Sequence, residues 1–140
     1  MTDYSDSFLR NVLERTEVIA MVGASPKLER ASNRVGKFLV SKGYRVIPVN
    51  PGQVGKELFG EPVIASLSDI REKVDMIDIF RRSEDIGPVI NEVLKMEDVQ
   101  TIWMQLGIIN EDAAAKAEAA GLDVIMDRCP AIEYPRLIGG

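Results

Sequence analysis

The chain has 140 residues, enough to bury a hydrophobic core without disulfides or a structural metal. It contains no histidine, which excludes imidazole catalysis and histidine-ligated metal sites within this chain. Its one cysteine, Cys129, cannot form an internal disulfide. The net charge of −5 argues against a nucleic-acid partner, because phosphate backbones are bound through an excess of Lys and Arg.

Neither a membrane span nor a targeting segment is predicted. No apolar run reaches the roughly 20 residues that cross a bilayer. The N-terminal stretch MTDYSDSFLRN lacks the basic and then apolar layout of a signal peptide. We therefore expect a cytoplasmic protein with no membrane partner. Because no repeat or linker interrupts the sequence, we expect residues 1–140 to form a single domain.

Short apolar runs alternate with segments of helical period, which is typical of βα units around a parallel sheet. The apolar runs predict five strands, at residues 17–22, 45–49, 75–80, 101–105 and 123–127. The helical segments lie at residues 5–14, 34–42, 84–96 and 111–120, with one further turn at 68–73. The β-branched and nearly unbroken apolar character of the strands suits a sheet that is buried on both faces.

This order of elements predicts an α/β fold with one Rossmann-like domain. Right-handed crossovers on both sides of the first strand give a five-stranded parallel sheet of order 3-2-1-4-5 with helices on both faces. Ligands of such sheets bind outside the carboxyl ends of the strands, where the strand order reverses, here between strands 1 and 4. The segments that follow Val22, Val49, Phe80 and Gln105 are therefore the candidates for a binding site.

The first strand ends in Gly23, Ala24 and Ser25. A glycine at this place allows a tight turn and the close approach of a phosphate, and the following helix offers free N–H groups. The dinucleotide fingerprint G-x-G-x-x-G is absent, because its second and third glycines are missing. The alternative interpretation is a plain strand-to-helix turn in which Ser32 or Asn33 caps the helix.

The second strand ends in Asn50 and Pro51, where a nicotinamide-binding unit carries an Asp or Glu for the ribose. The missing acid disfavours NAD and leaves room for a ligand whose ribose carries a phosphate. Asn50 and Pro51 are equally interpreted as turn formers without a ligand.

The third strand runs into Phe80, Arg81, Arg82 and Ser83. Two arginines at a strand end suit an anionic ligand, because guanidinium matches phosphate oxygens in a bidentate way. The alternative is a solvated pair of charges. In both interpretations Ser83 is expected to cap the next helix.

The fourth strand ends in Trp103, Met104 and Gln105, followed by Gly107 after one residue. Such a segment lines an apolar tunnel while offering one polar side chain, although alternating Trp and Met side chains more often belong to a core. Cys129, after the fifth strand, is interpreted as a small buried hydrophobe.

Five segments stand at successive strand ends in a fixed order. They read VIAMVGAS, GYRVIPVNPG, IDIFRRSED, IWMQLGI and GLDVIMDRCP. In order and spacing they resemble the small stand-alone CoA-binding proteins of bacteria and archaea, which are similar to the N-terminal CoA-binding domain of the succinyl-CoA synthetase α subunit. The resemblance covers about residues 17–130, nearly the whole chain.

The resemblance implies a site for coenzyme A. Gly23, Ala24 and Ser25 are expected to hold the CoA phosphates, and Asn50 and Pro51 to flank the nucleotide. Phe80 and Arg81 are then expected along the ligand, Met104, Gln105 and Gly107 near the pantetheine arm, and Asn33 and Arg34 at the start of the helix beside it.

Two departures from the synthetase pattern limit what the resemblance implies. Gln53 stands where the synthetase has a lysine, so recognition of the 3′-phosphate falls to another cation, such as Arg34, Arg81 or Arg82. The synthetase also carries phosphate on a histidine of another domain, and this chain has none. Ligase chemistry is therefore not expected.

The sequence favours a non-catalytic module that binds CoA or an acyl-CoA, without catalytic or metal-binding residues of its own. Two alternatives stay open. One is an enzyme on the same fold, either a CoA-dependent redox protein that uses Cys129 or an NAD(P)-linked one. The other is a subunit that acts only through contacts with a protein partner or with further copies of itself.

Overall fold

A five-stranded parallel sheet forms the centre of residues 2–139, which the computed structural model describes. Its strands are β1 (Val18–Val22), β2 (Arg45–Val49), β5 (Met76–Ile79), β6 (Thr101–Met104) and β7 (Asp123–Ile125). The helices are α1 (Asp6–Arg15), α2 (Ala31–Ser41), α3 (Ile86–Val93), α4 (Glu111–Ala119) and α5 (Pro130–Leu137). No helix within these residues is long and apolar enough to cross a membrane.

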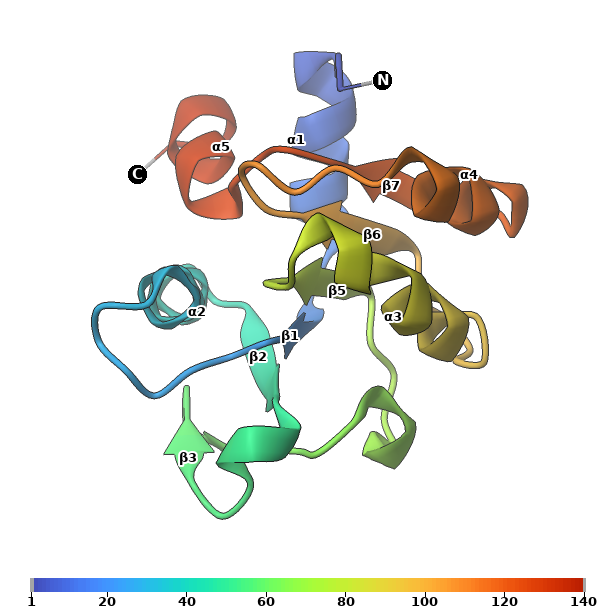
Figure 1. The fold of residues 1–140 in the computed structure, drawn as a ribbon. Helices are drawn as coiled ribbons and strands as arrows, with labels where there is room; N and C mark the ends of the chain where they lie inside the picture. Colours follow the sequence, from blue (N-terminus) through green and yellow to red (C-terminus); the bar gives the residue numbers. More distant parts are fainter. Residues whose placement is uncertain (1, 140) are drawn as a thin grey trace.

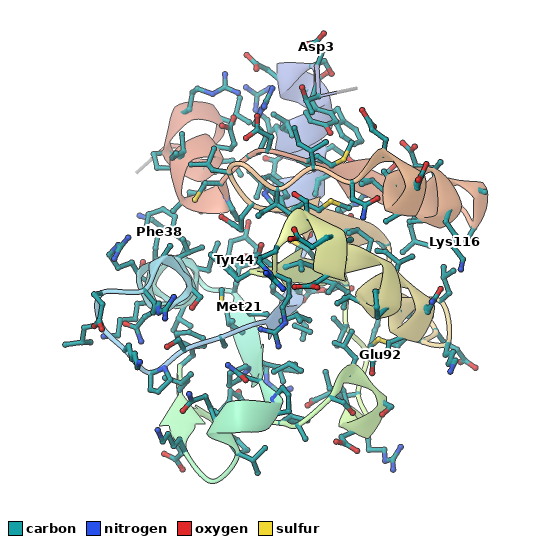
Figure 2. All side chains as sticks on the ribbon, in the orientation of Figure 1. Asp3, Met21, Phe38, Tyr44, Glu92 and Lys116 are labelled. Atoms are coloured by element: carbon teal, nitrogen blue, oxygen red, sulfur yellow. The ribbon has the colours of Figure 1, made fainter. Side chains whose placement is uncertain are left out.

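The sheet lies between two layers of helices. Figure 1 shows α2 and α5 on one side of the strands and α3 and α4 on the other, and α1 packs on the α2 and α5 side. Phe38 of α2 and Lys116 of α4 accordingly lie on opposite sides of the molecule (Figure 2). The predicted α/β Rossmann-like fold with helices on both faces is confirmed.

Successive side chains of each strand point to opposite faces of the sheet, which explains these two layers. Ile19 and Met21 of β1 pack toward α1, α2 and α5, whereas Ala20 and Val22 pack toward α3 and α4. All four side chains are buried, as expected for a parallel sheet that is covered on both faces.

The predicted strand order 3-2-1-4-5 is wrong. The order is β2-β1-β5-β6-β7, so the third long strand lies beside the first and not beyond the second. The reason lies in the segment between β2 and β5, which crosses back over β1. Its buried Leu67 belongs to the core on the α3 side of the sheet, and Ile64 pairs with Val49.

This second crossover contains no α-helix. It consists of the short turns η1 (Pro51–Gln53) and η2 (Leu67–Asp69) and a two-stranded hairpin, β3 (Glu57–Leu58) and β4 (Glu61–Pro62). The turn predicted at residues 68–73 therefore lies at Leu67–Asp69. The order of the five long strands becomes 2-1-3-4-5, which places the reversal between β1 and β5.

The C-terminal helix α5 is absent from the sequence predictions. Pro135 stands inside it, and proline is normally a reason to end a helix. The helix forms because Pro130 occupies its first turn, where no N–H is needed, and Leu137 and Glu133 are buried against the body of the molecule.

Candidate functional site

A cleft of about 870 Å³ opens at the carboxyl ends of the strands, where α2 and α3 leave the sheet on opposite faces. A volume of this size is typical of sites for small organic ligands. The cleft is lined by Gly23, Ser25, Lys27, Arg30, Ala31, Ser32, Arg34, Val35, Asn50, Gln53, Phe80, Arg81, Arg82, Asp85, Gln105, Leu106, Ile108, Cys129 and Ala131.

The end of β1 approaches the end of β5 more closely than a side chain allows. Gly23 has φ +88°, and a Cβ on it would lie 2.3 Å from the backbone oxygen of Phe80. Its N–H donates to the Val49 oxygen at 2.8 Å, so three neighbouring strand ends meet here. Any other residue at this position would have a strained backbone, and its Cβ would clash with the Phe80 oxygen.

Two asparagine amides fix the loop that follows Gly23. Asn50 Nδ2 donates to the Ala24 oxygen at 2.8 Å, and Asn33 Nδ2 donates to the Ser25 oxygen at 3.0 Å. Asn50 Oδ1 also accepts the N–H of Gly52 at 3.0 Å. These side chains therefore hold the shape of the cleft wall.

Helix α2 begins at the cleft, and its first N–H groups find no acceptor in the described part of the chain. Its N-cap is Arg30, which makes no side-chain capping bond. The backbone N–H groups of Ala31 and Ser32 have no hydrogen-bond partner within residues 2–139, and both residues line the cleft. Capping by Ser32 or Asn33 is wrong, because the helix begins before them. Free N–H groups at a helix start attract anions.

The cleft is cationic in an acidic protein. Its charged lining consists of Lys27, Arg30, Arg34, Arg81 and Arg82 against one carboxylate, Asp85. The positive charge is therefore local, because the whole chain carries −5.

The cations of the cleft differ in whether they are paired. Arg82 pairs with Asp85 at 3.0 Å, and Arg34 Nη1 donates to the Glu29 oxygen at 2.7 Å. In contrast, the half-buried Arg81 has no hydrogen bond or ion pair with any residue in the range 2–139. Its Nη1 lies 2.9 Å from the position that a Cβ on Gly23 would take.

Some of the residues predicted for the site line the cleft and others do not. Those that line it are Gly23, Ser25, Arg34, Asn50, Phe80, Arg81 and Gln105. Ala24, Asn33 and Met104 are buried, whereas Pro51 and Gly107 are exposed and outside the lining. Met104 points into the core on the α3 and α4 side, because its side chain alternates with that of Trp103.

Gly107 and Ser83 each make a hydrogen bond that connects two loops. The N–H of Gly107 donates to Asp127 Oδ1 at 2.7 Å, which ties the loop after β6 to the loop after β7. Ser83 does not cap α3: its Oγ accepts the N–H of Ile109 at 3.0 Å. Both contacts join segments that are far apart in the sequence.

Several lining residues are not predicted by the sequence. Lys27 and Arg30 lie in the loop before α2, which contains no motif of its own, and Leu106 and Ile108 follow the predicted Gln105. Cys129 and Ala131 enter the cleft because α5 begins there. A proline after a strand, here Pro130, is the one local signal that indicates such a helix start.

A buried polar cluster lies beneath the β6 side of the cleft. Asp78 of β5 is 0% exposed, and its Oδ1 accepts a hydrogen bond from Gln105 Nε2 at 2.6 Å. Its Oδ2 has no hydrogen-bond partner among residues 2–139, and burial raises the pKa of this carboxyl to about 7. Burial also raises the pKa of the Cys129 thiol, although the N–H groups of Ala131 and Ile132 act in the opposite direction.

Comparison with known proteins identifies the family and agrees with the fold. The family model of the CoA binding domain matches residues 17–135. This chain belongs to the CoA-binding domain family. The resemblance predicted from the strand ends is confirmed.

Relatives in this CoA-binding domain family include proteins of similar length. The uncharacterized protein YneT of Bacillus subtilis (strain 168) is 36% identical over 129 residues, which are 92% of this chain and 93% of YneT. A solved structure from Thermus thermophilus is 38% identical, with a TM-score of 0.91, and the match covers 96% of this chain and 99% of that chain.

The family fold also occurs inside a larger enzyme. An acetyl-coenzyme A synthetase of Ca. Korarchaeum cryptofilum, solved with phosphate and ADP, is 27% identical with a TM-score of 0.65 over 77% of this chain. The match spans 25% of that synthetase chain.

The buried Asp78 makes the stability of this CoA-binding domain pH-dependent. Its folded-state pKa of about 7 exceeds the ordinary value of 3.8, so the folded state binds more protons between these values. Stability from this group is thus present at low pH and is lost as the pH rises through that window. We predict that Asp78→Asn increasingly exceeds the parent in stability as the pH rises, by a few kcal/mol at most. Urea unfolding over this pH range measures the difference, and a constant difference would contradict the prediction.

Proposed function

We propose that the chain binds coenzyme A or an acyl-CoA in this cleft and acts as a binding module without catalytic residues of its own. The observation that carries the proposal is the guanidinium of Arg81, which lies half-buried above Gly23 without a partner among the described residues. An unpaired, partly desolvated cation is costly unless a ligand supplies the anion. Coenzyme A brings a pyrophosphate and a 3′-phosphate.

The β1 and β5 side of the cleft suits the phosphates. Donors to phosphate oxygens come from Arg81, from Lys27 and Arg30 in the same lining, and from the N–H groups of Ala31 and Ser32. Because Gly23 has no side chain, the end of β5 and the Arg81 guanidinium lie directly against its backbone, which places this cation at the turn after β1.

The β6 and β7 side suits the pantetheine arm. Leu106, Ile108 and Ala131 give this part of the cleft apolar walls, with the amide of Gln105 and the thiol of Cys129 among them. An arm that contains two amides, a short alkyl chain and a thiol matches apolar walls with few polar groups.

The alternatives find less support. Asn50 stands where a nicotinamide-binding site needs an acid for the ribose, and its amide is already bonded to Ala24 and Gly52. A redox role requires a thiolate, whereas the raised pKa of Cys129 keeps its thiol protonated near neutral pH.

We predict that the protein binds CoA and that CoA competes out NAD. Calorimetric titration of both compounds into the ligand-free protein is the measurement, preceded by mass spectrometry of any nucleotide that copurifies. Tight NAD binding without heat from CoA would overturn the proposed function.

Arg81→Ala should weaken CoA roughly ten- to hundredfold, because a charge-assisted hydrogen bond contributes about 1.5–3 kcal/mol. The matched control is Arg82→Ala, which removes an arginine already paired with Asp85 and should change affinity little. Titration of CoA and dephospho-CoA at one salt concentration then locates the contact. A loss confined to CoA assigns Arg81 to the 3′-phosphate, and an equal loss for both assigns it to the pyrophosphate. Unchanged affinity for both would show that Arg81 holds no phosphate.

Ala31→Pro tests the free N–H groups of α2. Ala31 is the first helical residue, a position that tolerates proline. Arg30 has φ −79° and ψ 139°, the extended backbone that a residue before proline needs. The variant should fold with unchanged stability and bind CoA roughly tenfold more weakly, since one donor to the ligand is lost. Ala31→Gly keeps the N–H and should bind like the parent. Equal affinities of all three proteins would exclude this N–H from the site.

A further inference from the structure

Asp78 is a carboxyl in the middle of the sheet. In register it lies between Met21 of β1 and Trp103 of β6, both of which are wholly buried on the α1, α2 and α5 side. Its own side chain is 0% exposed, and among residues 2–139 only Gln105 gives it a hydrogen bond. A polar group in such a place is costly to the fold, which calls for a reason beyond packing.

The one partner of Asp78 is a wall of the cleft. Gln105 is 7% exposed and lines the cleft beside Leu106 and Cys129. Its Nε2 donates to Asp78 Oδ1 at 2.6 Å, and within the described residues its Oε1 has no hydrogen-bond partner. One end of the amide is therefore committed to the protein, and the other end is left for a ligand.

An ionised carboxylate fixes the orientation of a neighbouring amide, because it offers no donor. An ionised Asp accepts and never donates, so the Gln105 amide can meet it only through Nε2. An asparagine at position 78 has both a donor and an acceptor and allows either orientation of the Gln105 amide. From the helix side, the Cys129 thiol at the start of α5 interacts electrostatically with Asp78.

We propose that Asp78 is a positioning residue: it fixes the Gln105 amide so that Oε1 offers a hydrogen-bond acceptor to an amide N–H of the pantetheine arm. The inference rests on the proposed function and adds the reason why the cleft selects a ligand with an arm of this chemistry. Asp78 itself does not touch the ligand, because it is wholly enclosed.

The test separates the arm from the nucleotide. Affinities for CoA and for adenosine 3′,5′-bisphosphate, which lacks the arm, are measured by calorimetry at about pH 8, above the raised pKa of the carboxyl. The proteins are the parent, Asp78→Asn, Gln105→Met and the double variant. Methionine keeps the length of the side chain and removes the acceptor.

We expect each single variant to bind CoA about tenfold more weakly, the effect of one hydrogen bond, and to bind the bisphosphate like the parent. The double variant should bind CoA no more weakly than Gln105→Met, because Asp78 acts only through Gln105. In the parent, the side-chain amide signals of Gln105 in ¹⁵N NMR spectra should shift on adding CoA and stay in place on adding the bisphosphate.

The outcomes that overturn the proposal are specific. Equal losses for both ligands would mean that Asp78 only supports the fold, and a further loss in the double variant would mean that it acts by another route. If the Asp78→Asn variant does not fold, the Gln105→Met variant decides. An unchanged CoA affinity of the Gln105→Met variant overturns the proposal. A parent protein that binds the bisphosphate and CoA equally also overturns it, whereas a parent that binds neither overturns the proposed function itself.

Discussion

The close approach of Gly23 to the end of β5 is the constraint on which the cleft depends. A Cβ at position 23 would lie 2.3 Å from the Phe80 oxygen, which is too close for any side chain. The backbone angle φ +88° is also one that only glycine adopts without strain. Helix α2, which follows β1, lies on one face of the sheet, and α3, which follows β5, lies on the other. The space between them is the cleft, and Arg81, the next residue after Phe80, is carried directly over Gly23. Substituting Gly23 would disturb the strand ends and the cleft together, so Arg81 and Ala31 separate binding from folding more cleanly.

The strands and many of the cleft residues were predictable from sequence because their signals are local. A β-branched run predicts a strand, and the glycine, amide or arginine that follows it marks the carboxyl end of that strand, as at Gly23, Asn50 and Arg81. Ligands of parallel sheets bind at these ends. The strand order was not predictable in this way. It is decided where the irregular segment after β2 buries Leu67 and pairs Ile64 with Val49, and these long-range contacts have no periodic pattern along the chain.

The missed part of the site has a different cause. Sequence propensity places the start of α2 at Arg34, whereas tertiary contacts extend the helix back to Ala31 and bury Ser32 and Asn33. The helix start thereby reaches the cleft with its N–H groups uncapped. At the other end of the chain, Pro135 conceals α5, and with it the fact that Cys129 faces the cleft. Propensity fails at these two helix ends because packing overrides it there.

The distribution of unsatisfied polar groups separates the scaffold from the site. Several long cations away from the cleft are paired, as Arg45 is with Glu61 and Glu72 and Arg136 with Glu133. Of the two buried side-chain atoms without a partner among residues 2–139, one is Asp78 Oδ2, directly beneath the cleft wall. The unpaired guanidinium of Arg81 and the free N–H groups at the start of α2 belong to the same region. A fold of marginal stability tolerates such groups only in small number. Their concentration at the strand ends argues that they are kept for a ligand that carries both phosphates and amides.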